Sequence, residues 1–185
     1  MVHSLRNHFL ISMPQLVDPN FDHSIVYVCD HNDNGAMGIV INRPMDLTLG
    51  DIFEHLQIED ASYVSGNRPV LAGGPVQMER GFVLHRLPRL WDSTLKVDDG
   101  VYLTTSKDIL NALAREDDES DTVVALGYAG WGAGQLEQEM ADNAWLAVPA
   151  DLDILFNTPL ENRWMAVNKL LGFDINLMSH QIGHA

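Results

Sequence analysis

The sequence contains little cysteine, little positive charge and no long apolar run. Its 185 residues include a single cysteine, Cys29, so no disulfide can form within the chain. A lone thiol is typical of a reducing compartment, and we therefore expect a cytoplasmic protein. No run of about eighteen apolar residues is present, and the first residues lack a basic segment followed by a long apolar one. The sequence thus predicts neither a membrane-spanning helix nor a signal peptide.

Positive charge is scarce. The chain has 11 basic and 26 acidic side chains, which gives a formal net charge of −15. A charge of this size repels the phosphates of nucleic acids and anionic membranes. The lysines and arginines are scattered, and no helix-turn-helix pattern, zinc-finger spacing or basic zipper is present. We therefore expect no direct binding to duplex DNA and no membrane association.

The remaining composition is that of one globular domain. Hydrophobic residues make up 46% and charged residues 20% of the chain, and 185 residues can enclose a sizeable core. Apolar and β-branched runs predict strands at residues 9–13, 24–29, 36–41, 69–72, 81–87, 100–104, 122–126 and 145–148. Amphipathic spacing predicts helices at 48–56, 107–115 and 135–143. Because strands and helices do not alternate strictly, we expect a single α+β domain over residues 1–185.

A further helix is predicted near the C-terminus. Thr158 and Glu161 have the spacing of a capping box, with Pro159 at the first helical position. Leu160, Trp164, Val167 and Leu171 would form one apolar stripe, which we interpret as core packing. Gly172 stands where a helix-ending glycine is common.

The most informative stretch is the glycine motif, Gly127-Tyr-Ala-Gly-Trp-Gly-Ala-Gly-Gln-Leu-Glu137. It predicts a strand that enters a helix through a glycine-rich turn. Such a turn can hold an anion at the helix N-terminus, or it can be a tight, buried corner. The motif lacks dinucleotide-fingerprint spacing and the Gly-Lys-Ser/Thr ending of a triphosphate loop. If the turn is a packed corner, we expect Gly132→Val to destabilise the fold, whereas a variant that melts like the parent but loses a ligand would indicate a binding site.

Several segments together resemble one family. They are Met13–Phe21, Cys29–His31, Gly35–Pro44, Gly73–Val76, Gly127–Glu137, Asn143–Trp145 and Gly183–Ala185, in order along the chain. The sequence is similar to the bacterial YqgE/AlgH family. The resemblance implies a bent, mostly antiparallel sheet rolled into a pseudo-barrel with flanking helices, in a cytosolic bacterial protein. It implies no particular activity, although some members are labelled transcriptional regulators. Ala133 stands where relatives often have proline.

Two groups of residues are candidates for a site. The first is a ligand-binding set, made up of Asn42, Arg43, Gly73, Gly74, Gly130, Gly132 and Gly134. Arg43 has the geometry to clamp a carboxylate or phosphate, or alternatively to cap nearby carbonyls or pair with Asp46. The second is Cys29 with His31, where an imidazolium would lower the thiol pKa if both side chains share one face of the strand. The alternative for Cys29 is a small, buried hydrophobe.

Metal sites are not predicted. Asp30, Asn32 and Asn34 imitate the start of a calcium loop, but position twelve is Ile41 rather than glutamate. His180 and His184 have helical spacing without a third ligand nearby. We expect no metal and no cofactor.

The sequence favours a non-enzymatic regulatory or binding module that acts through a small ligand or a protein partner. An enzyme of unknown class, using a cleft near the glycine motif, is the alternative. A regulator that contacts DNA directly is disfavoured by the net charge.

Overall fold

The computed structural model of the chain describes residues 4–14, 21–59, 61–62, 66–86, 90–115 and 121–172. Its strands are β1 (His8–Ser12), β2 (Ile25–Asn32), β3 (Gly35–Val40), β4 (Pro44–Thr48), β5 (Pro69–Ala72), β6 (Val76–His85), β7 (Thr94–Asp98), β8 (Val101–Thr104), β9 (Thr122–Gly132) and β10 (Trp145–Pro149). Its helices are α1 (Leu49–His55), α3 (Asp108–Ala114), α4 (Gln135–Ala141), α5 (Leu152–Asn157), the 3₁₀ helix η1 (Leu160–Asn162) and α6 (Arg163–Leu171).

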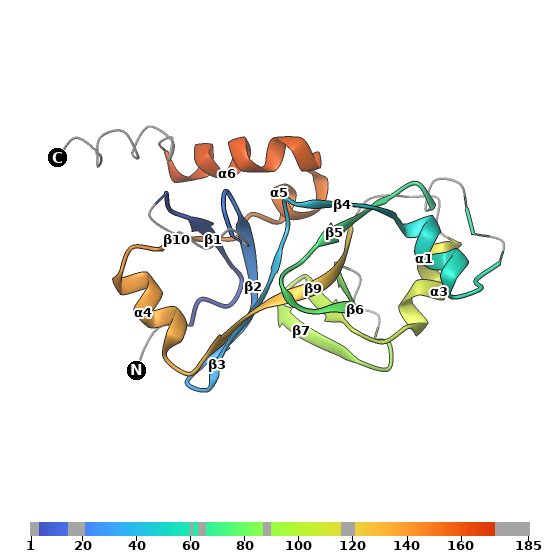
Figure 1. Cartoon of the computed structure of the whole chain (residues 1–185), viewed down its shortest axis with the longest axis horizontal. Helices are drawn as coiled ribbons and strands as arrows, with labels where there is room; N and C mark the ends of the chain where they lie inside the picture. The colour runs from blue at the N-terminus through green and yellow to red at the C-terminus, as the bar shows by residue number, and fades with distance from the viewer. Residues whose placement is uncertain are drawn as a thin grey trace.

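The strands form one strongly curved sheet, which confirms the expected α+β class. Neighbouring strands run in the order β10-β1-β2-β3-β9-β6-β8-β7, while β5 pairs with both β4 and β9. The pairing is antiparallel except between β5 and β9. The sheet curls into a half-barrel, with α5 and α6 lying over the β1–β10 end and α1 and α3 gathered at the other end (Figure 1). The sheet thus has two wings that meet at β9.

Strand β9 joins these two wings. Its first half pairs with β6, where Val124 lies opposite Val83, and its second half pairs with β3, where Gly130 lies opposite Met37. The predicted passage from a strand into a helix is present, but the strand extends to Gly132, so most of the glycine motif is strand rather than turn. The turn is confined to Ala133 and Gly134, and Gly134 takes a φ of 76° at the start of α4.

The glycines of the motif and of the Gly73–Gly74 segment meet at a backbone crossing. A Cβ on Gly74 would lie 2.1 Å from the carbonyl carbon of Tyr128, and one on Gly73 would lie 2.4 Å from the Gly127 oxygen. Gly127 itself has a φ of 78°. Only residues without a side chain allow two backbones to approach this closely. We refer to this place, made by Gly73, Gly74, Gly127 and Tyr128, as the glycine crossing.

Three apolar clusters fill the two faces of the sheet. Period-two alternation sends Tyr27 into the largest cluster, together with residues of α5 and α6. Val26 and Val28 enter a second cluster, which includes Leu136 of α4. A third cluster joins Leu49 and Phe53 of α1 to residues of α3 and the outer side of β6 and β9. Both faces of the sheet are therefore buried over much of their area.

The predicted start of the last helix is also wrong. The structure forms helix α5 first, and Asp151 caps it by accepting hydrogen bonds from the backbone N–H groups of Asp153 and Ile154. Thr158 then lies in an extended conformation just after α5, and α6 begins only at Arg163 without a side-chain cap. The predicted end is confirmed, since Gly172 has a left-handed φ of 86°. His180 and His184 lie outside the described residues.

The glycine crossing predicts unequal effects for two substitutions. Gly74→Ala combines backbone overlap with a φ of 154°, so we expect it to lower the free energy of unfolding by at least about 3 kcal/mol. A Cβ at Gly132 would meet only the Gln135 Oε1 atom at 3.9 Å, so Gly132→Val should change the free energy of unfolding by less than about 0.5 kcal/mol. The open surroundings of Gly132 thus replace the expectation from the sequence that this substitution is destabilising. Urea unfolding of both variants tests this. An equal loss of unfolding free energy in the two variants would contradict the close backbone contact at the glycine crossing.

Candidate functional site

At the end of the glycine motif, side-chain hydrogen bonds attach α4 to the sheet. Glu139 Oε1 accepts from the indole N–H groups of Trp131 at 3.1 Å and Trp145 at 2.9 Å. Gln135 donates to the other Glu139 oxygen at 3.0 Å and accepts from the Gly132 backbone N–H at 3.0 Å. These side chains therefore position a helix, which is a structural role for this part of the motif.

His31 and Glu137 extend this network. The His31 ring is buried, and its Nδ1 accepts a 2.8 Å hydrogen bond from the Leu5 backbone N–H. Because a backbone N–H can only donate, Nδ1 carries no proton, and Nε2–H donates to Glu137 Oε1 at 3.0 Å. This hydrogen bond from His31 lowers the pKa of Glu137 below its usual range. The pair joins the N-terminal segment, β2 and α4.

The lowered Glu137 pKa predicts a pH dependence of stability. A carboxylate whose folded pKa lies below its unfolded value, about 4.3, contributes stability above that value and loses it as pH falls through the folded pKa. We expect Glu137→Gln to cost about 1 kcal/mol at pH 7, and this cost should shrink below about pH 4. Thermal unfolding between pH 3.5 and 7 measures it. The exposed Glu161→Gln is the control, and a cost that does not vary with pH would contradict the pairing.

Cys29 and His31 do not form a reactive pair. The register between β2 and β3 shifts between Val28 and Asp30, so a β-bulge occupies the Cys29 position. Cys29 continues the alternation of Ile25 and Tyr27 and joins the largest core cluster, whereas His31, after the shift, lies opposite Ala36, which packs against the cluster under α4. The expectation of a shared strand face is wrong, because the bulge reverses the alternation. Burial raises the pKa of the Cys29 thiol, which opposes nucleophilic chemistry.

We predict that Cys29 is unreactive in the folded protein. Its side chain has no exposed surface, so alkylation must wait for the core to open. Labelling with iodoacetamide near neutral pH should be at least about 100-fold slower than in urea-unfolded protein. Fast labelling of the native protein would return Cys29 to the list of candidate reactive groups.

The proposed ligand-binding residues do not gather at one place. Asn42 accepts from the Ile25 N–H at 2.9 Å and donates to the His23 carbonyl at 2.8 Å. Arg43 donates to the Asp22 carbonyl at 2.6 Å, in agreement with its alternative as a carbonyl cap. Gly73 and Gly74 lie at the glycine crossing, and Gly132 and Gly134 lie near the start of α4. Gly130 borders an open hollow that Met37 also lines.

A larger hollow lies elsewhere, between α1, α3 and the outer side of β6. It is a groove of about 850 Å³. Phe82, Val83 and Val124 form its buried floor, and the half-buried aliphatic side chains around it are Leu47, Ile52, Leu56, Leu110 and Leu126. We call this hollow the α1–α3 groove. A volume of this size and an apolar wall are typical of small-molecule sites.

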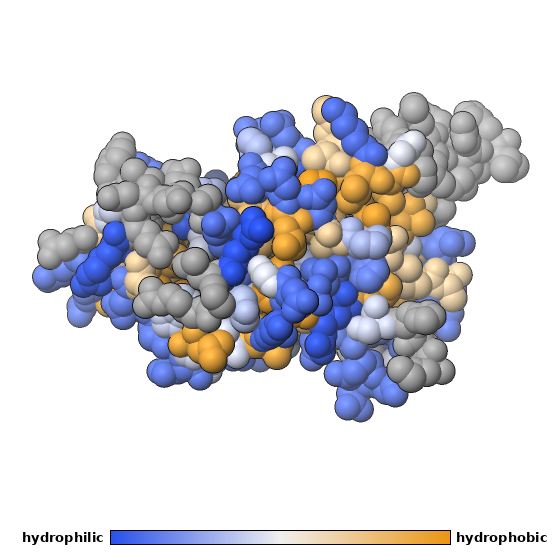
Figure 2. Space-filling view, turned by 180° about the vertical axis from the view of Figure 1, so that it is seen from behind, coloured by the Kyte–Doolittle hydropathy of each residue, from blue (hydrophilic) through white to orange (hydrophobic). Residues whose placement is uncertain are grey.

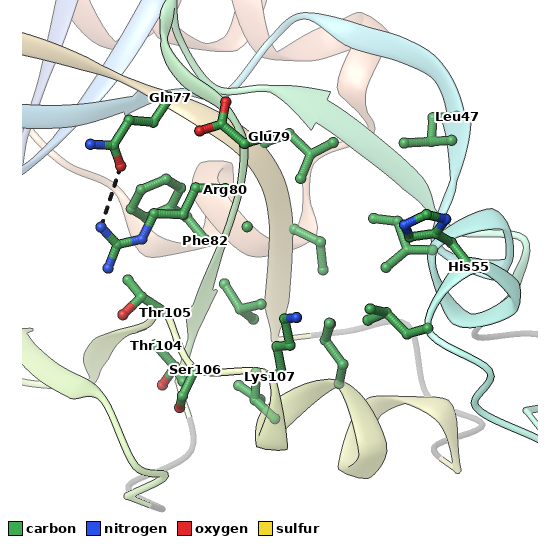
Figure 3. Close-up of a pocket in the computed structure, with 18 of the residues that line it drawn as sticks. Leu47, His55, Gln77, Glu79, Arg80, Phe82, Thr104, Thr105, Ser106 and Lys107 are labelled. Carbon is green, nitrogen blue, oxygen red and sulfur yellow. Dashed lines mark hydrogen bonds between the residues drawn. The ribbon is translucent and has the colours of Figure 1, made fainter.

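Polar and charged groups surround the groove. Figure 3 shows Arg80 on one side, His55 of α1 on the opposite side and Lys107 rising between them. Arg80 donates to the Gln77 side chain at 3.4 Å, and its guanidinium lies 5.5 Å from the centre of the Phe82 ring. Lys107 forms no ion pair with any residue that the structure describes. The groove therefore offers basic groups above an apolar floor.

A large register shift in β6 creates one wall of this groove. β6 pairs with β9 at Val76 and again from Gly81, and the residues between them stand away from the sheet. This shift lies beside Gly127, where a Cβ would be 3.3 Å from the Met78 Cα. The sequence did not predict the groove, because amphipathic spacing alone does not say which apolar side chains of α1 enter the core. The signal in the sequence was the width of the apolar face of α1. Leu49 and Phe53 are buried in the core, and Ile52 and Leu56 remain to line the groove.

Within the described ranges, no group of three or more His, Cys, Asp or Glu side chains could hold a metal ion. No helix in the same part of the chain is both long and apolar enough to cross a membrane.

Fold and groove together define an α+β half-barrel protein with a ligand-sized hollow. A model of the AlgH-like family matches residues 9–176, so the chain belongs to this family, as the sequence resemblance predicted. A UPF0301 protein from Thioalkalivibrio sulfidiphilus is 58% identical over 179 residues, which cover 97% of this chain and 96% of its own. Another from Saccharophagus degradans is 56% identical over 182 residues, or 98% and 89% of the two chains.

Two solved structures support the fold. The solution structure of the AlgH protein from Pseudomonas aeruginosa matches over the full length of both chains, with a TM-score of 0.80 and 44% identity. A crystal structure of a protein from Corynebacterium diphtheriae has a TM-score of 0.70 over 90% of this chain and 86% of its own, at 16% identity. The second likeness concerns the fold alone. None of these names states an activity, so function must be argued from the groove.

Proposed function

We propose that this protein is a cytoplasmic binding module, with a regulatory rather than catalytic role, that takes a small amphipathic molecule in the α1–α3 groove. One observation carries the proposal: five half-buried aliphatic side chains surround a hollow of about 850 Å³. When a ligand covers the apolar surface of such a hollow, that surface is removed from water, which lowers the free energy of the complex. The hollow is also large enough for a ligand of ordinary drug size.

The charges around the groove favour a ligand with an acidic head group. Lys107 and Arg80 present cationic groups over the apolar floor, as Figure 3 shows. Two acids also line the groove: Asp51 is engaged in the capping box of α1, where its carboxylate accepts from the Thr48 N–H at 2.9 Å, and Glu79 is exposed next to Arg80 in the sequence. Lys107 is therefore the cation on which the proposal of an acidic head group depends. A carboxylate or sulfonate head beside Lys107, with an apolar body over Phe82, would use both features.

Binding is preferred to catalysis because the polar groups of the groove act separately. Ser106 donates its hydroxyl to Asp108 rather than to a base within the groove. Arg80 is held by Gln77. A hydroxyl hydrogen-bonded to a base is the usual mark of nucleophilic catalysis, and Thr104 forms such a pair with His85 Nε2 at 2.7 Å. Both side chains are fully buried, however, so this pair does not face a ligand in the groove.

Direct contact with DNA is not part of this proposal. A net charge of −15 opposes duplex binding, and the rear face carries hydrophobic patches separated by hydrophilic residues (Figure 2). A regulatory effect would therefore pass through the ligand or through a protein partner.

Filling the groove tests the proposal. Gly81 lines the groove, and a Cβ there would make only an ordinary 3.9 Å contact with Leu126. Gly81→Phe should therefore fold normally while its ring occupies the ligand's place. We expect it to weaken binding of the amphipathic probe 8-anilinonaphthalene-1-sulfonate at least tenfold, about 1.4 kcal/mol, measured by fluorescence titration. Lys107→Glu should weaken the same probe by removing the cation.

Gly132→Phe is the matched control. Gly132 is equally open, with one 3.9 Å contact, but it lies outside the groove. It should bind the probe like the parent. Circular dichroism of all variants separates loss of binding from loss of folding. Unchanged affinity in folded Gly81→Phe, or an equal loss in both glycine variants, would overturn the assignment of the groove.

A further inference from the structure

A second hollow has a different chemical character. It measures about 520 Å³ and lies where β5 and the start of β9 meet the segment between α5 and α6. Among the described residues that line it, the only charged side chains are Arg68 and Arg163, which are 7% and 8% exposed. Two buried guanidinium groups therefore lie at one hollow of a chain whose net charge is −15. We call it the arginine cavity.

Arg163 is held in place by carbonyl groups rather than by a carboxylate. Its Nε donates to the Thr158 carbonyl at 3.1 Å, and its Nη1 donates to the Ile41 carbonyl. It forms no ion pair with any side chain in the described ranges. Burial lowers its pKa to about 10, so the guanidinium stays charged at neutral pH. A guanidinium has five N–H donors, and these bonds use two of them.

A buried hydroxyl provides an independent observation. Thr122 lines the same cavity and is 7% exposed, yet its Oγ has no hydrogen-bond partner among the described residues. Buried polar side chains nearly always have a partner. Beside it, Arg68 donates from Nη2 to the Thr122 carbonyl at 2.8 Å, which places that guanidinium at the start of β9.

We propose that the arginine cavity binds a small oxyanion, a carboxylate or phosphate group, through Arg163 and the Thr122 hydroxyl. Burying the Arg163 guanidinium removes its charge from water, and the surrounding carbonyls offset this cost only in part. A charge-assisted hydrogen bond to a bound anion would offset the rest. Leu71, Phe156 and Leu160 form the apolar part of the wall. They leave room for a short hydrocarbon body behind the anionic group.

This site is distinct from the α1–α3 groove. The two hollows share only Val124 among their described linings, and none of the basic groups of the groove reaches the arginine cavity. The proposals can therefore fail separately.

Thr122→Val gives the sharpest test, because it removes the hydroxyl and keeps the shape. The hydroxyl has no partner in the described structure, so the variant should be at least as stable as the parent without ligand. Hexanoate and inorganic phosphate are titrated at constant ionic strength, with the side-chain Nε–H signal of Arg163 followed by NMR. We expect a saturable shift with at least one probe, and at least a fivefold weaker affinity in Thr122→Val.

The controls separate the possible sources of a signal. Thr105→Val alters a threonine of the groove and should leave the affinity unchanged, as should Gly81→Phe. A response to hexanoate alone identifies a carboxylate ligand, and a response to phosphate alone identifies a phosphorylated one. No saturable shift with either probe, or unchanged affinity in a folded Thr122→Val, would overturn the proposal. A hexanoate response lost in Gly81→Phe would assign the probe to the groove instead, and would also overturn it.

Discussion

The close backbone approach at the glycine crossing is the constraint on which the rest of the structure depends. There, the segment after β5 passes against β9 so tightly that a Cβ on Gly74 would overlap the Tyr128 backbone. Gly127 has a positive φ at this contact, so β9 bends there. The strand still pairs with β6 before the bend and with β3 after it. One strand thereby serves two wings of the sheet, and the half-barrel closes around a core that draws residues from both wings.

The same constraint produces the α1–α3 groove. Beside Gly127, β6 cannot keep its register with β9, and the residues between Val76 and Gly81 stand away from the sheet. They form one wall, while α1 and α3 form the others. The glycine motif therefore contributes to the candidate site indirectly. It shapes the sheet that leaves the hollow, instead of supplying groups that line it, and this explains why a distinctive motif need not contain binding residues.

Sequence patterns predicted the elements that local chemistry determines. The strands predicted at residues 24–29 and 36–41 correspond to β2 and β3, and the helix predicted at 48–56 corresponds to α1. The errors lie where tertiary contacts override local preference. Glycine is depleted in strands, yet Gly130 and Gly132 are strand residues because β3 needs a partner there. The bulge at Cys29 leaves no trace in composition, so the separation of Cys29 from His31 could not be read from their spacing.

Charge shows why hollows, and not the outer surface, are the places where this protein can select ligands. The long-range field of a −15 chain repels anions, but salt screens it over about 8 Å under physiological conditions. Inside a hollow, the nearest charges dominate, since screening and solvation are weaker there. This argument applies most strongly to Arg163, which is buried, and less to Lys107 and Arg80, which are exposed at the groove. Under the two proposals, a polyanion too large to enter a hollow would meet only the repulsive surface, whereas a small anion with an apolar body would reach these cations.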